Sequence, residues 1–179
     1  IYATELATVT NSIITSNGWG VLVFGSAYIS ESTITSNFCA GVDTFANSTI
    51  TGSQIFGNGD DGVYSYMGSI TVTNSYVSGD AEGVDTDGET VLIVNSQVIG
   101  TNGDGVYAEL DATVIDSQVQ GDVDGVFSNN GMVIIYNSHI TGTIDEGVEA
   151  WTNIVISDST ITSQDNGVLA SQGDITVNN

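Results

Sequence analysis

The segment Val72-Thr73-Asn74-Ser75-Tyr76-Val77 decides the fold, because its pattern returns along the whole chain at a nearly constant spacing. The first apolar residue of each copy, which we call the anchor, is in turn Val9, Ile29, Ile50, Val72, Ile93, Val114, Ile135, Ile156 and Val177. Subtraction of neighbouring numbers gives spacings of 20, 21 and 22 residues and then 21 throughout. Such a period indicates a solenoid with one coil per repeat.

A second landmark, the pair Gly-Val, keeps the same period, with its valines at Val21, Val42, Val63, Val84, Val106, Val126, Val148 and Val168. Between the landmarks, apolar and polar residues alternate over short runs that are rich in β-branched residues and are ended by Gly. Stacking equivalent strands in parallel buries every anchor and pairs the backbone groups. We therefore expect an all-β fold over residues 1–179, a single-domain right-handed parallel β-helix of about eight coils of about 21 residues, with three short strands per coil.

Period-two alternation assigns the inward side of each strand. The anchors and the Gly-Val valines form two inward columns. A third begins at Ala7 and Ala27 and continues through Ser48, Ile70, Val91, Ala112, Val133, Ile154 and Ile175. A fourth runs through Ile14, Ile34, Ile55, Val77, Val98, Val119, Ile140 and Ile161. A fifth consists of small residues, which let the walls approach closely: Thr44, Ser65, Thr86, Ala108, Ser128, Ala150 and Ala170.

A turn residue precedes the Ser of most repeats, and it is Asn11, Asn74, Asn95 and Asn137, with Asp116 and Asp158 as near-equivalents. Stacked Asn side chains can hydrogen-bond along a ladder at a tight turn. The repeat resembles the pectin-lyase-like parallel β-helix motif, Ile-x-Asn-Ser-x-Ile-x-Gly followed by Gly-Val or Gly-Ile, over essentially the whole chain. The resemblance implies a parallel β-helix fold. It does not single out one activity, since lyases, glycosidases, phage tailspikes, adhesins and surface proteins share the repeat.

The charge is one-sided, with 22 Asp and Glu, no Lys and no Arg, and a net charge of −22. Without cations to neutralise phosphate, nucleic acid is excluded as a partner, and so are anionic membrane surfaces. The field favours cations, cationic partners or neutral polymers. The single cysteine, Cys39, has no intrachain partner, and we interpret it as a small buried or half-buried hydrophobe, with intermolecular pairing as the alternative.

An acidic edge is expected at the turn before each Gly-Val pair. Its carboxylates are Asp60, Asp61, Asp80, Glu82, Asp104, Asp122, Asp124, Asp145 and Glu146, followed by Asp165. Their mutual repulsion is relieved by protons, by salt or by Ca²⁺, which prefers oxygen ligands on flexible turns. A calcium edge is therefore one interpretation, and a hydrated face with diffuse cations is the other. The nonapeptide calcium motif of RTX proteins is absent, and the sequence makes no cofactor certain.

Two outward faces are unusually apolar. Aromatic residues follow the Gly-Val valines at Phe24, Phe45, Tyr64, Tyr66, Tyr107, Phe127 and Trp151. The outward side of the anchor strand carries Leu92, Val94, Ile115, Ile134, Tyr136 and Val155. Lateral packing against another chain is the interpretation that we favour, and sugar stacking on the aromatic face is the alternative. Thr residues on the anchor strand, such as Thr71 and Thr73, also fit an ice-binding ladder, but an interrupted one.

Catalysis and a structural role are both open to this fold. Asp85 and Asp87 point to the same outward side, as a pair of glycosidase carboxylates would, with Glu109 and Glu149 on later coils. β-Helical lyases and galacturonases rely on Arg or Lys, which this sequence lacks, and His139 has no carboxylate in its own segment. No catalytic residue is therefore assigned.

We expect a non-enzymatic β-solenoid that is extracellular or at the cell surface, as part of a filament, fibre, surface layer or adhesin stalk. Neither end carries an evident cap, so we expect self-association by end-to-end stacking of coils, assisted by the lateral apolar faces, or a longer solenoid of which this is a piece. The alternative is a carbohydrate-binding or glycoside-hydrolysing β-helix of the pectin-lyase-like type, with glycans as partners.

Overall fold

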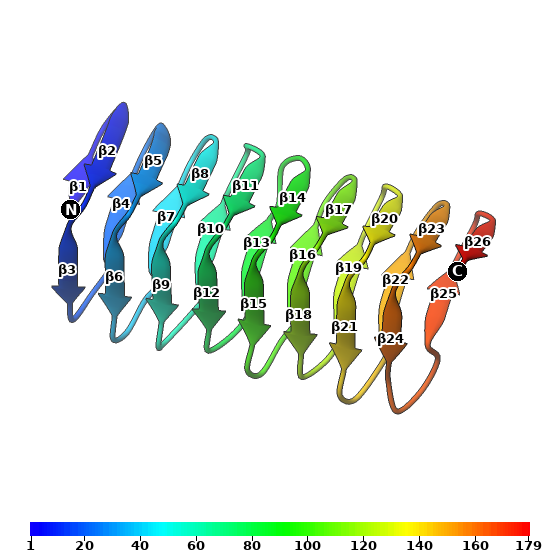
Figure 1. Ribbon diagram of the computed structural model, residues 1–179. Coiled ribbons are helices and arrows are strands. Elements are labelled where there is room, and N and C mark those ends of the chain that lie inside the picture. Colours follow the sequence, from blue (N-terminus) through cyan, green and yellow to red (C-terminus); the bar gives the residue numbers. More distant parts are fainter.

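The computed structural model describes residues 1–179 and forms a rod of stacked coils, with the N-terminus at one end and the C-terminus at the other (Figure 1). Each coil contributes one strand to each of three parallel sheets, which we call A, B and C in chain order. The structure contains strands and turns but no helix, and therefore no helix that is long and apolar enough to cross a membrane. The predicted all-β solenoid of about eight coils with three strands per coil is confirmed.

Sheets A and B have nine strands each, and sheet C has eight. Sheet A consists of β1 (Tyr2–Ala3), β4 (Val21–Val23), β7 (Val42–Thr44), β10 (Val63–Ser65), β13 (Val84–Thr86), β16 (Val106–Ala108), β19 (Val126–Ser128), β22 (Val148–Ala150) and β25 (Val168–Ala170). Sheet B consists of β2 (Leu6–Thr10), β5 (Ser26–Ser30), β8 (Ser48–Thr51), β11 (Ile70–Thr73), β14 (Val91–Val94), β17 (Ala112–Ile115), β20 (Val133–Tyr136), β23 (Ile154–Ser157) and β26 (Ile175–Asn178). Sheet C consists of β3 (Ile13–Ser16), β6 (Thr33–Ser36), β9 (Gln54–Gly57), β12 (Tyr76–Gly79), β15 (Gln97–Gly100), β18 (Gln118–Gly121), β21 (His139–Gly142) and β24 (Thr160–Thr162).

The register places equivalent residues of successive coils side by side. Anchor pairs with anchor, as Val72 does with Ile93, and the valine of one Gly-Val pair meets the next, as Val84 meets Val106. The inward columns merge into one cluster of 31 buried apolar residues along the rod. Ile175, expected inward, is instead 46% exposed, because its strand β26 has a neighbouring strand on one side only.

The glycine of every Gly-Val pair except the last, at Gly167, has a steric reason. A Cβ on Gly83 would lie 2.5 Å from a methyl carbon of Val98 and 2.6 Å from the carbonyl oxygen of Gly105 on the next coil. Both distances are too short for any side chain. The chain therefore keeps glycine where sheet C turns into sheet A, and this contact explains the second landmark of the repeat.

The corner between sheets B and C holds a polar ladder. Its turn residues have positive φ, between 46° and 57°, and they are Asn11, Glu31, Gly52, Asn74, Asn95, Asp116, Asn137 and Asp158. Asn tolerates this left-handed conformation better than most residues. The expected Asn ladder is present in part, because Asn95 donates to the side-chain oxygen of Asn74 at 2.6 Å and Asn137 donates to that of Asp116 at 2.6 Å.

The Ser that follows each turn residue continues this ladder inside the wall. The backbone N–H of Ser75 donates to the hydroxyl oxygen of Ser96 at 3.1 Å, and that hydroxyl donates to the carbonyl of Val94 at 2.7 Å. The same N–H to hydroxyl bond recurs at every coil interface from Ser12 to Ser159. From Ser32 to Ser159, each hydroxyl therefore satisfies two backbone groups of the wall.

Replacing one Ser of this ladder tests its contribution. We expect Ser96→Ala to lower the free energy of unfolding by about 1–3 kcal/mol, because the buried N–H of Ser75 and the carbonyl of Val94 both lose a partner. Chemical denaturation followed by circular dichroism measures the change. Ser78→Ala is the matched control, since Ser78 faces outward on β12. Equal losses in the two variants would contradict a structural role for the hydroxyl ladder.

Candidate functional site

The outer face of sheet A brings together most of the residues with chemical potential. The valines point inward, so the residue after each of them points outward, in the order Leu22, Asp43, Tyr64, Asp85, Tyr107, Phe127, Glu149 and Leu169. Two residues further on, a second outward column reads Phe24, Phe45, Tyr66, Asp87, Glu109, Asn129, Trp151 and Ser171. The turn before each Gly-Val pair supplies a third column, which contains much of the acidic edge.

Asp85 occupies the centre of this face. In the sheet register it lies between Tyr64 of the preceding coil and Tyr107 of the following coil. The hydroxyl of Tyr64 donates to the carboxylate of Asp87 at 2.7 Å, so it is not available to Asp85. The Oδ1 atom of Asp85 is buried and has no hydrogen-bond partner. A buried acceptor without a donor is uncommon in folded proteins and calls for a partner.

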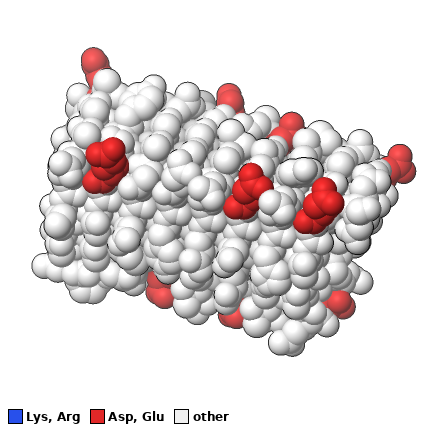
Figure 2. All heavy atoms as spheres, in the orientation of Figure 1, with Lys and Arg blue, Asp and Glu red and all other residues white.

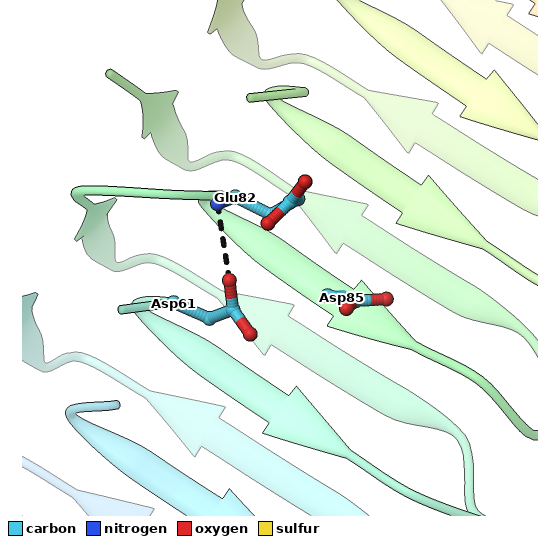
Figure 3. A group of neighbouring side chains, drawn as sticks. All are labelled: Asp61, Glu82 and Asp85. Atoms are coloured by element: carbon cyan, nitrogen blue, oxygen red, sulfur yellow. Dashed lines mark hydrogen bonds between the residues drawn. The ribbon is translucent and has the colours of Figure 1, made fainter. Parts of the chain in front are cut away.

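Asp85 belongs to a compact acidic group with Asp61 and Glu82 (Figure 3). One carboxylate oxygen from each of the three lies within 4.8 Å of the others. The backbone N–H of Glu82 donates to Oδ1 of Asp61 at 3.0 Å, which fixes the Asp61 side chain against the next coil. Asp61 is buried, while Glu82 and Asp85 are half-buried. Such a group can hold a proton, a metal ion or an organic cation.

The pKa values of this group reflect burial and mutual repulsion. Burial, a hydrogen bond with Glu82 and the charges of Asp85 and Glu82 raise the pKa of Asp61 from 3.8 to about 9. Burial and the charges of Asp87, Glu82, Asp104 and Asp60 raise the pKa of Asp85 from 3.8 to about 8. Both carboxyls therefore retain protons at neutral pH. The chain has no Lys or Arg to reverse this effect.

The acidic edge continues as a second ladder along the rod. Oδ1 of Asp104 accepts the backbone N–H of Asp124 at 3.0 Å, and Oδ1 of Asp124 accepts that of Glu146 at 2.8 Å. All three side chains are buried. Burial is the largest cause that raises the pKa of Asp104 to about 6 and that of Asp124 to about 7. These carboxyls are structural acceptors between coils, which neither the calcium nor the hydrated-face interpretation anticipated.

The remaining residues of the edge fall into different surroundings. Asp124, Asp145 and Glu146 form a second group with carboxylate oxygens within 4.8 Å of one another, which also has a geometry that could hold a metal ion. Asp60, Asp80, Asp104 and Asp122 belong to neither group, and Asn102 donates to the Asp80 carboxylate at 3.1 Å. On the face drawn in Figure 2 the acidic side chains stand apart from one another. The predicted acidic edge therefore contains two clusters, and a ladder of buried carboxylates runs from Asp104 into the second of them.

Two adjoining hollows lie on sheet A over the N-terminal half of the rod. One, of about 440 Å³, is acidic, and its lining includes Trp19, Ala40, Asp43, Asp60, Asp61, Tyr64, Glu82, Asp85 and Asp87. The other, of about 390 Å³, is mostly apolar, and its lining includes Trp19, Leu22, Phe24, Asp43, Phe45, Tyr64 and Tyr66. Because Trp19, Asp43 and Tyr64 line both, the two hollows form one groove with an acidic and an apolar part.

The predicted aromatic face divides into groups rather than forming one column. Phe45 and Tyr66 have ring centroids 5.2 Å apart, and Tyr107 and Phe127 have centroids 5.4 Å apart. Asp85 and Asp87 separate these two pairs, and Trp151 lies two coils beyond the second pair's Tyr107. A further pair on sheet C, Phe56 and Tyr76 at 5.4 Å, was not expected from the sequence, although its position in neighbouring strands is readable from the repeat.

The apolar residues predicted on the outside of sheet B do face outward. Leu92, Val94, Ile115, Ile134 and Val155 are half-buried, since each is flanked by its neighbours in the ladder, and Tyr136 is 49% exposed. His139 is exposed on sheet C, in register with Gln118 and Thr160, away from the acidic groups. Cys39 is half-buried and free.

The fold and this face define the chain as an acidic parallel β-solenoid with a grooved outer sheet. No family model matches the chain, and no curated protein or solved structure matches it either.

The raised pKa values predict that stability falls as pH rises. Protons bind more tightly to Asp61, Asp85 and Asp124 in the folded state than in the unfolded chain. Protonation of each carboxyl therefore stabilises the fold, and this contribution is complete below the unfolded pKa of about 4. This stabilisation is lost progressively as pH rises toward the folded values of about 9, 8 and 7. We expect a higher melting temperature at pH 5 than at pH 9.

The variant Asp61→Asn should make the melting temperature less dependent on pH, because Asn keeps the acceptor for the Glu82 N–H without a charge. Asp60→Asn is the matched control, since Asp60 is adjacent and exposed. Thermal melts at several pH values measure the slope. If both variants flatten it equally, general charge repulsion and not burial causes the pH dependence.

Proposed function

We propose that this chain is a non-enzymatic structural β-solenoid, extracellular or at the cell surface, that forms the rod of a fibre, surface layer or adhesin stalk and associates with other copies through its outer faces. The observation that carries the proposal is the continuity of the three sheets. Every coil repeats the same cross-section, and the same strand pairing runs through all coils without an inserted domain. At the usual strand spacing such a stack is about 40 Å long, a shape suited to a spacer.

Lateral contact is supported by the exposed aromatic side chains of sheet A. Phe45 is 44% exposed and Tyr66 is 52% exposed, and their rings already pack against each other. With Leu22, Phe24 and Tyr64 they line the apolar hollow of sheet A, and a contiguous exposed apolar patch of this kind can mark a surface that binds another protein. Copies with a net charge of −22 repel each other, however, so association of this kind requires salt or other cations to screen the charge.

Salt should therefore promote self-association. We expect the sedimentation coefficient to increase between about 0.01 M and about 1 M salt, because the screening length falls from about 30 Å to about 3 Å. Sedimentation velocity measures the change. The double variant Phe45→Ser and Tyr66→Ser should remain monomeric at high salt. Phe38→Ser, which removes an aromatic residue 74% exposed in a turn, should still associate. A native protein that is monomeric under all these conditions would contradict the proposal.

A second candidate is a carbohydrate-active β-helix of the pectin-lyase-like type. The observation that favours it is the pair Asp85 and Asp87 on the outer face, in which the charge of Asp87 contributes to the raised pKa of Asp85. A carboxyl with a raised pKa beside a second carboxyl is the arrangement that glycosidases use to protonate a leaving oxygen and activate water. The acidic groove repels polyuronates, so the substrate class would be a neutral polysaccharide.

Hydrolysis can be tested directly. If this second candidate is right, release of reducing ends from neutral polysaccharides should be detectable and should fall at least a hundredfold in Asp85→Asn, since a general acid contributes about that much. Asp174→Asn, on the last coil, is the control for the loss of one charge. Absence of reducing ends with every substrate in the native protein would leave the structural proposal in place and remove the catalytic one.

A further inference from the structure

The groove on sheet A has an unusual combination of walls. Its acidic part contains the group Asp61, Glu82 and Asp85, and the rings of Trp19 and Tyr64 form walls beside it. Its other part is apolar, with Phe45 and further aromatic side chains. Negative charge, aromatic faces and an adjoining apolar surface occur together at sites that bind organic cations.

Asp85 supplies the observation that requires a donor. Its Oδ1 is buried without a hydrogen-bond partner, although the side chain as a whole lines the groove. The groups whose charges act on Asp85 are Asp87, Glu82, Asp104 and Asp60, and all are acidic. The neighbouring hydroxyls of Tyr64 and Tyr107 donate to Asp87 and Glu109 respectively. The chain offers no Lys or Arg, and its one His, His139, lies on sheet C, so a donor with positive charge for Asp85 has to come from a ligand.

We propose that this groove binds an organic ammonium ion, with the ammonium group at Asp61, Glu82 and Asp85 and its apolar body against Phe45 and the neighbouring rings. On binding, the ammonium ion takes the place of the protons that Asp61 and Asp85 retain at neutral pH, and its N–H groups donate to the carboxylates, including the unpartnered oxygen of Asp85. The rings of Trp19 and Tyr64 attract the cation through their faces. Ligand binding does not require the structural role proposed above, although the groove shares Phe45 with the proposed self-association surface.

The apolar part of the groove distinguishes this ligand from a metal ion. Ca²⁺ takes six to eight oxygen ligands and gains nothing from aromatic walls. One oxygen of Asp61 is already occupied by the N–H of Glu82. An ammonium ion with a short apolar chain uses both parts of the groove at once, which a hydrated metal ion does not.

Phenethylammonium is a suitable probe, because it joins one ammonium group to one aromatic ring. We expect saturable one-to-one binding in calorimetry, and weaker binding of both 2-phenylethanol, which lacks the charge, and ethylammonium, which lacks the ring. In NMR spectra the indole N–H resonance of Trp19 should shift on titration. The resonance of Trp151, which lies outside the groove, serves as the internal reference and should not move.

Variants locate the site. Asp85→Asn should weaken phenethylammonium binding by about tenfold or more, the cost of one charge-assisted hydrogen bond. Asp174→Asn removes the same charge from the last coil and should leave the affinity unchanged. Phe45→Ser should weaken phenethylammonium and leave ethylammonium unaffected.

Three outcomes would overturn the proposal. They are absence of saturable binding, equal weakening by Asp85→Asn and Asp174→Asn, which indicates diffuse counterions, and binding of Ca²⁺ at this group that phenethylammonium does not displace. Measurement at protein concentrations and salt where the chain is monomeric keeps this result separate from that of the self-association experiment.

Discussion

The parallel register between successive coils is the constraint on which the rest of the structure depends. Because equivalent residues pair from coil to coil, each side chain has a neighbour of the same position about 4.8 Å above and below it. A residue type that recurs in the sequence thus becomes a column in space. Ile and Val columns form the core, the Ser column bonds buried backbone groups, and carboxylates are brought close together whether or not their repulsion is favourable.

The acidic residues follow two different solutions to that repulsion. Asp104 and Asp124 are buried and accept backbone N–H groups from the next coil, which gives their oxygens partners. Asp85 sits between two tyrosines and has one oxygen with no partner at all. The hydrogen bonds of Asp104 and Asp124 hold successive coils together, whereas Asp85 makes no such bond through its buried oxygen. The outer face of sheet A is therefore the part of the rod where we look for a function beyond structure.

The fold could be predicted from the sequence because period and alternation are one-dimensional signals that a solenoid converts directly into position. The spacing of Val72, Ile93 and Val114 determines the strand register, and the alternation around them determines the inward side. The candidate site was predicted less completely. The sequence identifies Asp61 and Glu82 as edge residues, but it does not reveal their association with Asp85. Glu82 lies in the turn before β13, Asp85 is the outward residue of β13, and Asp61 lies in the equivalent turn of the preceding coil.

Burial of the carboxylates was not predicted, although the sequence carries a signal for it. Asp104 stands directly before a Gly-Val pair, as do the buried Asp61, Asp124 and Glu146, whereas the exposed Asp80 stands three residues before one. That a carboxylate at this position accepts a backbone N–H of the next coil required coordinates. The glycine of Gly-Val is a similar case. Its recurrence was visible, while the reason for it, the contact of Gly83 with Gly105 and Val98, required coordinates.

The corner ladder between sheets B and C has a consequence for how such a rod changes in evolution. Across this corner, the number of residues from the anchor to the inward residue of sheet C is constant, as from Val9 to Ile14 and from Ile93 to Val98. The turn from sheet C to sheet A varies in length, since it is one residue longer after Ile34 than after Ile14. Insertions and deletions are therefore tolerated at the turns without the Ser ladder, because there they leave every column in place. Those turns border the groove face, so new loops can be added beside the site while the corner opposite preserves the coil.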